Sequence, residues 1–292
     1  MSAATAAPVA VHDSYARPGA LTPAGAPPIV SVANLEKYYH RNHVLRGCSL
    51  DVYPRETVCL IGRSGSGKST LLRTLVGLER PTSGDVILRG RNLCAMTDQE
   101  WRELRQHIGI SFQSGALFGS MSVGENVALP LLEHTQLDPA TIEIMVRLKL
   151  NEVGLNGYED YMPAQLSGGM KKRAAVARAM AMDPEILFFD EPSAGLDPII
   201  AAGIDQLLLK LKEAFGITII VVTHELASAF LIADRMVLLD KGRIVAVGTT
   251  AELQASTHPR VRQFLDRVAE PEISQEIDYL QMLTGEVPRP RQ

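Results

Sequence analysis

The sequence contains few cysteines, no long apolar run and no excess of positive charge. Its three cysteines, Cys48, Cys59 and Cys94, stand among 292 residues at spacings that fit no metal site. So few thiols favour a reducing, cytosolic compartment over a disulfide-stabilised secreted fold. No apolar run reaches the roughly 18 residues that span a bilayer, and the N-terminus lacks the basic and apolar regions of a secretory signal. A role at a membrane would therefore require a partner.

Lysine and arginine are outnumbered, with 29 basic against 33 acidic residues and a net charge of −4. This balance argues against a nucleic-acid surface, and we expect no nucleic-acid partner. The 46% hydrophobic and 21% charged content is ordinary for a soluble globular protein. The length suits one large domain or two modest ones.

Three segments differ in composition. Residues 1–28 are rich in Ala and Pro and are predicted to be a disordered leader. Between 29 and 256, apolar runs alternate with helical patterns, which predicts an α/β fold with a mostly parallel sheet covered on both faces. Residues from about 122 to 182 are mostly helical and are interpreted as an inserted subdomain, and 257–292 as a helical extension. The predicted strands are 29–35, 57–61, 85–90, 107–112, 186–190, 217–222, 236–240 and 243–248, and the predicted core helices are 70–78, 198–214 and 225–232.

The stretch GRSGSGKST, here called the phosphate loop, matches the pattern G-x-x-x-x-G-K-[ST] between a predicted strand and a predicted helix. Small residues let backbone N–H groups converge on phosphate oxygens, and the helix N-terminus adds a favourable dipole. Lys68 is expected to reach the β- and γ-phosphates, and the Ser69 hydroxyl to ligate Mg²⁺. The alternative, a glycine-rich turn without chemistry, fits this context poorly. The expected nucleotide-binding residues are Gly62, Arg63, Ser64, Gly65, Ser66, Gly67, Lys68, Ser69 and Thr70.

The stretch ILFFDE (186–191) predicts a buried strand with two acidic residues at its carboxyl end. Asp190 is expected to hold Mg²⁺, and Glu191 to orient or deprotonate the attacking water. The alternative is a buried strand that ends in an ordinary acidic turn.

Three further polar residues have weaker signals. His224 follows the predicted strand 217–222 and could hydrogen-bond the γ-phosphate or the attacking water. Gln113 follows the strand 107–112 at the same edge and suits water or Mg²⁺. Tyr39 could stack on an adenine, with Tyr38 as its competitor and simple packing as the alternative.

These motifs occur in one order along the chain. They are Tyr39, GRSGSGKST, Gln113, LSGGM (166–170), ILFFDE, SAGLD (193–197) and TH (223–224). The ordered set resembles the ATP-binding cassette (ABC) ATPases over roughly residues 29–256. The resemblance implies a P-loop NTPase (RecA-like) core with an antiparallel β subdomain and an inserted α-helical subdomain, and it implies ATP and Mg²⁺ as cofactors.

The resemblance also implies a head-to-tail dimer of two copies that sandwiches two ATP molecules. Ser167, Gly168 and Gly169, here called the signature segment, would form an anion-binding nest against the γ-phosphate held by the partner's loop. Asp197 would lie across the same interface.

The signature segment has a plainer interpretation and one unusual neighbour. Taken alone, LSGGMKKR could be a capped helix start with Lys171, Lys172 and Arg173 in solvent. Met170 stands where the family has Gln, so the helix cap is expected to differ locally while the phosphate-contacting residues stay intact.

Several short strings narrow the resemblance to the ATPase subunits of Mla-type, MCE-associated transporters. They are FQSGALF (112–118), EHTQL (133–137), LSGGM and HPRVRQFLD (258–266). That family moves phospholipids or other lipids between the membranes of double-membraned bacteria and plastids. The resemblance implies an MlaE-like permease, and it suggests a STAS-domain protein like MlaB and an MCE protein like MlaD. It also implies a peripheral location on the cytoplasmic face of the inner membrane.

Two apolar faces mark the predicted helical extension. One is formed by Val261, Phe264, Leu265 and Val268, and Pro271 separates it from a second face formed by Ile273, Ile277, Leu280 and Leu283, with Gly285 as a C-cap. These faces could pack on their own domain or on a neighbouring subunit, and the Mla resemblance favours the neighbour.

Other functions are weighed against the transporter ATPase. A soluble ABC ATPase that acts on nucleic acid would need two cassettes or a long insertion, and its surface would not be acidic. A P-loop kinase of small molecules would have no use for LSGG or SAGLD. A transporter ATPase with a different cargo stays open, because no residue in the sequence identifies a lipid.

Overall fold

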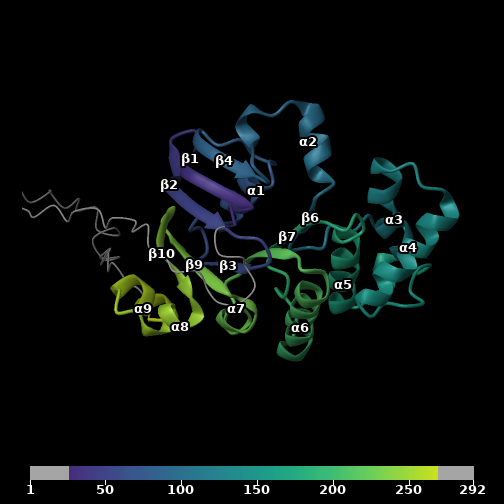
Figure 1. Cartoon of the computed structure of the whole chain (residues 1–292). Coiled ribbons are helices and arrows are strands. Elements are labelled where there is room, and N and C mark those ends of the chain that lie inside the picture. Colours follow the sequence, from purple (N-terminus) through teal and green to yellow (C-terminus); the bar gives the residue numbers. More distant parts are fainter. Residues whose placement is uncertain (1–25, 269–292) are drawn as a thin grey trace, which may run out of the picture.

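The computed structural model describes residues 26–268, which form two sheets with helices around them (Figure 1). Nearly all of the predicted leader and the second apolar face of the extension lie outside the described residues. The central sheet has six strands in the order β10-β9-β3-β8-β7-β6. The strands are β3 (Thr57–Ile61), β6 (Ile108–Ser111), β7 (Ile186–Asp190), β8 (Thr218–Val222), β9 (Arg235–Asp240) and β10 (Arg243–Thr249). All neighbours pair in parallel except β10, which is antiparallel to β9, so the predicted mostly parallel sheet is confirmed.

The second sheet is antiparallel and has the order β2-β1-β4-β5. Its strands are β1 (Val30–Tyr39), β2 (Asn42–Val52), β4 (Ser83–Leu88) and β5 (Arg91–Asn92). Strand β2 was not predicted from the sequence. Its buried residues do not alternate strictly, and its pairing with β1 contains register shifts, so the period of two is interrupted.

Helices cover the central sheet and extend beyond one edge of it. They are α1 (Lys68–Leu75), α2 (Asp98–Arg105), α3 (Val123–His134), α4 (Pro139–Glu152), α5 (Gly168–Ala179), α6 (Pro198–Phe215), α7 (Leu226–Ile232), α8 (Thr250–Ala255) and α9 (Pro259–Leu265), with short 3-10 turns at Leu93–Ala95 and Pro163–Gln165. Local sequence explains many of the helix starts. Capping boxes open α2, α3 and α8, and an Asp-Pro pair opens α4 and α6.

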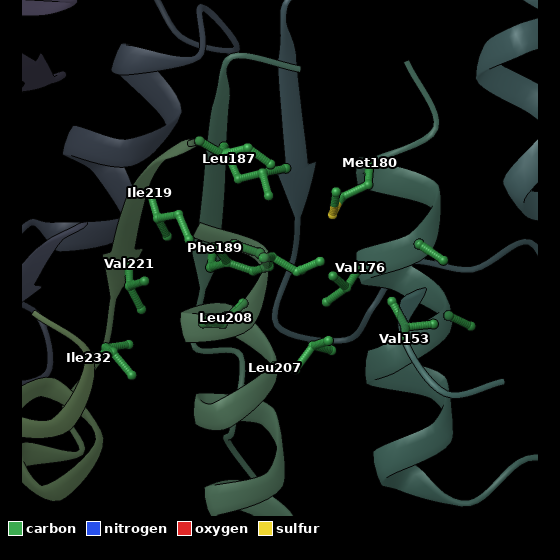
Figure 2. Close-up of a cluster of buried hydrophobic side chains, with 14 of the residues drawn as sticks. Val153, Val176, Met180, Leu187, Phe189, Leu207, Leu208, Ile219, Val221 and Ile232 are labelled. Carbon is green, nitrogen blue, oxygen red and sulfur yellow. The ribbon is translucent and has the colours of Figure 1, made fainter. Parts of the chain in front are cut away.

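Buried strand residues alternate between the two faces of the central sheet. In β7, Leu187 and Phe189 face the cluster formed with α5, α6 and α7, and Figure 2 shows them beside Val176, Leu207 and Leu208. Ile186 and Phe188 face the opposite cluster, which includes α1 and the antiparallel sheet. Both faces of β7 are therefore apolar, which is why this strand is a continuous hydrophobic run in the sequence.

The first apolar face of the extension packs on its own domain. Val261 of α9 is fully buried, and Phe264 and Leu265 lie against the same core cluster as α6 and α7. Of the two alternatives, packing on its own domain is therefore confirmed for Val261, while Phe264 and Leu265 are only partly buried and their cover by a neighbouring subunit stays a prediction. Val268 is 59% exposed, and the second face, from Ile273 onwards, lies outside the described residues.

Candidate functional site

Four adjacent strands of the central sheet end at one edge. The phosphate loop follows β3, His224 follows β8, Asp190 ends β7, and Gln113 follows β6. Because these strands run in parallel, their carboxyl ends bring together residues that lie up to 162 positions apart in the sequence (224 minus 62). This is the edge at which open α/β sheets bind ligands.

The phosphate loop is anchored to the turn between β9 and β10. The Gly242 N–H donates to the Ser66 carbonyl at 3.0 Å, and a Cβ on Gly62 would lie 2.1 Å from the Leu239 carbonyl oxygen. Gly67 caps α1 in the left-handed region at φ 106°. Glycine is therefore required at both ends of the loop, once for close approach and once for backbone conformation.

Lys68 folds back over the loop. Its ammonium donates to the carbonyl oxygens of Gly62 at 2.8 Å and Arg63 at 3.0 Å. Burial lowers the pKa of Lys68, and the carboxylates of Glu191 and Asp190 act in the opposite direction.

The loop fits a phosphate chain. The buried Ser66 hydroxyl has no hydrogen-bond partner among the described residues, and the buried ammonium of Lys68 stands beside it on the same loop. An unsatisfied donor and a buried cation at a helix N-terminus suit an anionic ligand.

Asp190 and Ser69 form the candidate Mg²⁺ site. The Ser69 hydroxyl donates to Asp190 Oδ1 at 3.3 Å. Burial raises the pKa of Asp190, and the hydrogen bond from Ser69 partly opposes this. Within the described residues, no group of three or more His, Cys, Asp or Glu could hold a metal by itself. One carboxylate and one hydroxyl fit Mg²⁺, which is commonly held by one or two carboxylates together with substrate phosphates and water.

Glu191 has an unusual backbone and a close contact with His224. Its φ is 51°, in the left-handed region, and its N–H donates to the Val222 carbonyl at 2.8 Å. The Glu191 Oε1 atom lies 2.8 Å from the ring nitrogen Nδ1 of His224, and the backbone N–H of His224 donates to Glu191 Oε2 at 3.4 Å. The structure therefore places Glu191 and His224 next to each other, the two residues that were expected to contact the attacking water.

A cavity of about 550 Å³ lies over the loop. Its lining consists of Val44, Ser64, Gly65, Gly67, Lys68, Ser69, Thr70, Gln113, Glu191 and His224. Phosphate-binding, water-handling and metal-binding candidates thus share one space, within the usual size of a small-molecule site. Val44 was not predicted, because a single Val at a strand position has no signal of its own.

Tyr39 is not among the residues that line this cavity. Its hydroxyl donates to Glu79, and the ammonium of Lys37 lies 4.9 Å from the centroid of its ring. Its competitor Tyr38 stacks on His43 with the ring centroids 4.0 Å apart. Stacking of Tyr39 on an adenine stays a prediction.

The signature segment forms the start of α5. The Ser167 hydroxyl accepts from the Met170 N–H at 3.3 Å and caps the helix. The Met170 side chain packs against the core and takes no part in this cap. A Cβ on Gly169 would lie 2.5 Å from Ile200 Cγ2, so glycine lets the segment approach the start of α6.

Asp197 lies beside the signature segment and caps α6. Its Oδ1 atom accepts from the N–H groups of Ile199 at 3.0 Å and Ile200 at 3.1 Å. Neither Asp197 nor the signature segment contributes to the lining of the cavity over the phosphate loop. The described chain thus carries two separate groups of candidate phosphate ligands.

Lys172, one turn into α5, was not predicted to contact the candidate site. The plainer interpretation of LSGGMKKR placed it in solvent, but it is 8% exposed and donates to the main-chain oxygens of Gln113 and Glu191. No local signal distinguishes it from Lys171, because its partners lie in the loops that follow β6 and β7, far from it in the sequence.

Comparisons with known proteins match this architecture. A family model described as ABC transporter matches residues 45–194. The MlaF ATP-binding protein of the intermembrane phospholipid transport system of Escherichia coli (strain K12) is 44% identical over 222 residues, covering 76% of this chain and 82% of that protein. A probable ribonucleotide transport ATP-binding protein, mkl, of Mycobacterium leprae is 39% identical over 237 residues, covering 81% of this chain and 68% of that protein.

A solved structure gives the same result for the fold. The dimeric structure of a post-hydrolysis state of the ATP-binding cassette MJ0796, bound to ADP and Pi, is 32% identical with a TM-score of 0.70. The match covers 75% of this chain and 98% of that one.

Proposed function

We propose that this chain, which belongs to the ABC transporter family, is the ATP-hydrolysing subunit of a transporter that moves phospholipids or related lipids across the bacterial cell envelope. As a member of that family, the chain is an ATPase subunit of a transporter. The phospholipid cargo is proposed from the 44% identity to MlaF.

The observation that carries the proposed mechanism is the separation of the signature segment from the cavity over the phosphate loop. A second copy, placed head to tail, could bring its Ser167, Gly168 and Gly169 to the phosphates held by the first. ATP would then complete the interface, because the nest complements only a loaded partner. The dimer of MJ0796 supports this arrangement.

Within each site, different residues of this chain bind the triphosphate, hold Mg²⁺ and position the attacking water. The phosphate loop, residues 62–70, binds the triphosphate, and Lys68 balances its charge. Asp190, Ser69 and Gln113 would hold Mg²⁺, which when bound neutralises charge on the transferred phosphoryl group. Glu191 orients or deprotonates the attacking water, and the contact with His224 holds its carboxylate in place.

The membrane partners are proposed from the MlaF relatives. Within residues 26–268 no helix has the length and apolar character needed to cross a bilayer. We infer a peripheral position on the cytoplasmic face of the inner membrane, against an MlaE-like permease, with an MlaB-like STAS-domain protein and an MlaD-like MCE protein as further partners. Closing and opening of the ATP dimer would move the permease between two states.

A second cargo is supported by the relative from M. leprae, whose name refers to ribonucleotide transport. Purification of the tagged full-length chain from detergent-solubilised membranes distinguishes a lipid cargo from a ribonucleotide cargo. Recovery of a permease together with bound phospholipid supports the lipid proposal. Recovery of a permease that binds ribonucleotides instead contradicts it.

The head-to-tail site is tested by mixing two damaged subunits. Lys68→Ala removes the phosphate-facing cation, and Gly168→Asp places a carboxylate where the partner's phosphate would lie. Each homodimer then has two damaged sites. The mixed dimer has one intact site, because that site takes its loop from the Gly168→Asp chain and its nest from the Lys68→Ala chain.

We expect ATPase activity in this mixture above that of either homodimer. A double mutant with both changes in one chain, mixed with the wild type, serves as the control, since every site of that mixed dimer has one fault. If Gly168→Asp alone abolishes ATP binding to the monomer, and the mixture shows no cross-linked dimer, the signature segment serves its own chain and the proposal is wrong.

A further inference from the structure

Lys172 contacts the main chain of two residues of the candidate site. Its ammonium donates to the carbonyl oxygen of Glu191 at 3.1 Å and also to the carbonyl oxygen of Gln113. These two residues follow different strands, β7 and β6, and α5 meets them from a third element. One side chain thus joins the two loops that line the cavity on the side of Glu191.

The charge of Lys172 is buried at this point. The residue is 8% exposed, and burial lowers its pKa while Glu191 and Asp190 act in the opposite direction. A buried ammonium is costly unless its donors are satisfied. Two carbonyl oxygens accept from this ammonium, and the charges of the Glu191 and Asp190 carboxylates favour its charged form.

The backbone of Glu191 itself lies in an unfavourable conformation, with φ at 51°. A non-glycine residue in the left-handed region is strained and persists only when its surroundings hold it. The Glu191 N–H is held by Val222 and its carbonyl by Lys172. The direction of the Glu191 side chain therefore depends on both bonds.

The same helix carries the signature segment. Lys172 lies four residues after Gly168, one turn along α5. Further along, Arg178 donates to the carbonyl oxygens of Gly115 at 2.9 Å and Ala116 at 2.8 Å. Main-chain oxygens of residues 113–116 are thus hydrogen-bonded to α5 through both Lys172 and Arg178.

We propose, on the basis of the proposed ATP sandwich, that Lys172 is a positioning residue that ties the hydrolytic groups of its own site to the helix that presents the signature segment to the partner. Helix α5 is held in the domain by its packing against β6 and α6. From this helix, Lys172 holds the main chain of Gln113 and Glu191 in the geometry for hydrolysis. Lys172 does not itself touch the nucleotide.

Three variants of the full-length chain test this role. Lys172→Met keeps the apolar stem and removes the donors, Lys172→Arg restores a cation, and Lys171→Met is the control. Lys171 is on the same helix and its side chain makes no hydrogen bond among the described residues. Because a misplacement of about 1 Å can cost roughly 10²-fold in rate, we expect Lys172→Met to lower kcat by about 10- to 100-fold. We expect KM for ATP to change by less than about twofold, partial recovery of kcat in Lys172→Arg, and kcat near that of the wild type in Lys171→Met.

Folding is checked separately by thermal unfolding and by the fluorescence of Trp101, the single tryptophan. Because Lys172→Met leaves the carbonyl oxygens of Gln113 and Glu191 without this donor, the melting temperature should fall, and kcat is compared at a temperature at which both proteins are folded. A kcat of Lys172→Met within twofold of the wild type overturns the proposal. A KM that rises in parallel with the loss of kcat/KM, at unchanged kcat, overturns it too.

The mixed dimer shows in which of its two chains Lys172 is needed for hydrolysis at the intact site. Its intact site uses Gln113 and Glu191 of the Gly168→Asp chain, so Lys172→Met in that chain should remove the recovered activity. The same change in the Lys68→Ala chain, which supplies only the signature segment, should leave most of it. Equal loss from both placements, or loss only from the second, overturns the proposal. If the unmodified mixture is inactive, the ATP sandwich fails instead, and the kcat comparison of the homodimers still decides the role of Lys172.

Discussion

At the scale of single residues, the site is determined by a few side chains whose environments differ sharply. Glu191 and Glu225 both lie near the imidazole of His224. Glu191 Oε1 is 2.8 Å from Nδ1 and its side chain is 11% exposed, whereas Glu225 Oε1 is 3.6 Å from Nε2 and its side chain is 49% exposed. Only Glu191 lines the cavity over the phosphate loop.

Glu191→Gln should therefore keep ATP binding and lose turnover by roughly 10²–10⁴-fold, the usual effect of one general base. The measurement is steady-state ATPase activity together with the ATP affinity obtained by calorimetry. Glu225→Gln is the matched control and should retain turnover. Turnover of Glu191→Gln within threefold of the wild type would contradict the assigned role.

Asp205 is a buried carboxylate outside the site. It is 4% exposed on α6, accepts a hydrogen bond from Ser228, and its Oδ1 atom has no partner among the described residues. Burial raises its pKa, and the nearby Glu225 carboxylate adds to this. Between the ordinary pKa of Asp, about 3.9, and the raised value, the native state binds more protons than the unfolded state, so stability falls as the pH rises.

Asp205→Asn removes this titration and should stabilise the protein at pH 7, by on the order of 1 kcal/mol. The advantage should shrink as the pH is lowered through the raised pKa, because the wild-type carboxyl is then protonated. Thermal unfolding of both proteins between pH 7 and pH 4 measures the difference. Asp51→Asn, at an exposed position, is the control and should show no such trend. An advantage that is constant with pH would exclude the carboxylate as its cause.

At the scale of elements, α5 is the component on which the site depends most. It lies between α6 and the pair α3 and α4, and it packs against β6 (Figure 1). Its approach to β6 is possible because residue 109 is glycine. A Cβ on Gly109 would lie 2.1 Å from the Ala179 carbonyl oxygen and 2.6 Å from Leu187 Cδ2.

Gly109→Ala should therefore displace α5 from β6 and destabilise the fold by about 1–3 kcal/mol, as small-to-large changes in a packed core do. Thermal unfolding checks this, with an expected fall of roughly 2–4 °C per kcal/mol for a chain of this size. Gly119→Ala is the matched control, because a Cβ there meets nothing within 4 Å. Equal melting temperatures for the two variants would contradict the packing argument.

At the scale of the whole molecule, the proposed dimer would bury the start of α6 beside the signature segment. Ile199 is 84% exposed there, two residues after Asp197. Ile144, on α4, is 60% exposed and belongs to a different helix. Ile199 is therefore an exposed isoleucine in the proposed interface, and Ile144 is an exposed isoleucine on a different helix.

Ile199→Glu should weaken the ATP-dependent dimer by at least about tenfold, or roughly 1.4 kcal/mol, because a carboxylate would be buried near bound phosphate. Binding of ATP to the monomer should be unchanged. Size-exclusion chromatography in ATP, with Glu191→Gln in the background to prevent hydrolysis, measures dimer formation, and Ile144→Glu is the control. Equal dimer formation by the two variants would place the interface elsewhere.

The sequence alone determined the features that depend on neighbouring residues. The spacing in GRSGSGKST and the continuous apolar strands are local signals, so they predicted the parallel sheet and most of the candidate site. The order of LSGGM, ILFFDE and TH along the chain then indicated the family. Each of these signals is contained within a few positions or in the order of motifs.

Only the tertiary structure decided which distant residues meet. It placed Lys172 on the carbonyls of Gln113 and Glu191, paired Tyr39 with Glu79, and packed Phe264 on its own domain. Strand β2 was missed for a related reason, since the register shifts in its pairing with β1 interrupt the period of two. The partner of a side chain depends on how strands and helices assemble. This assembly depends on the packing of the whole core, so no single stretch of sequence predicts it.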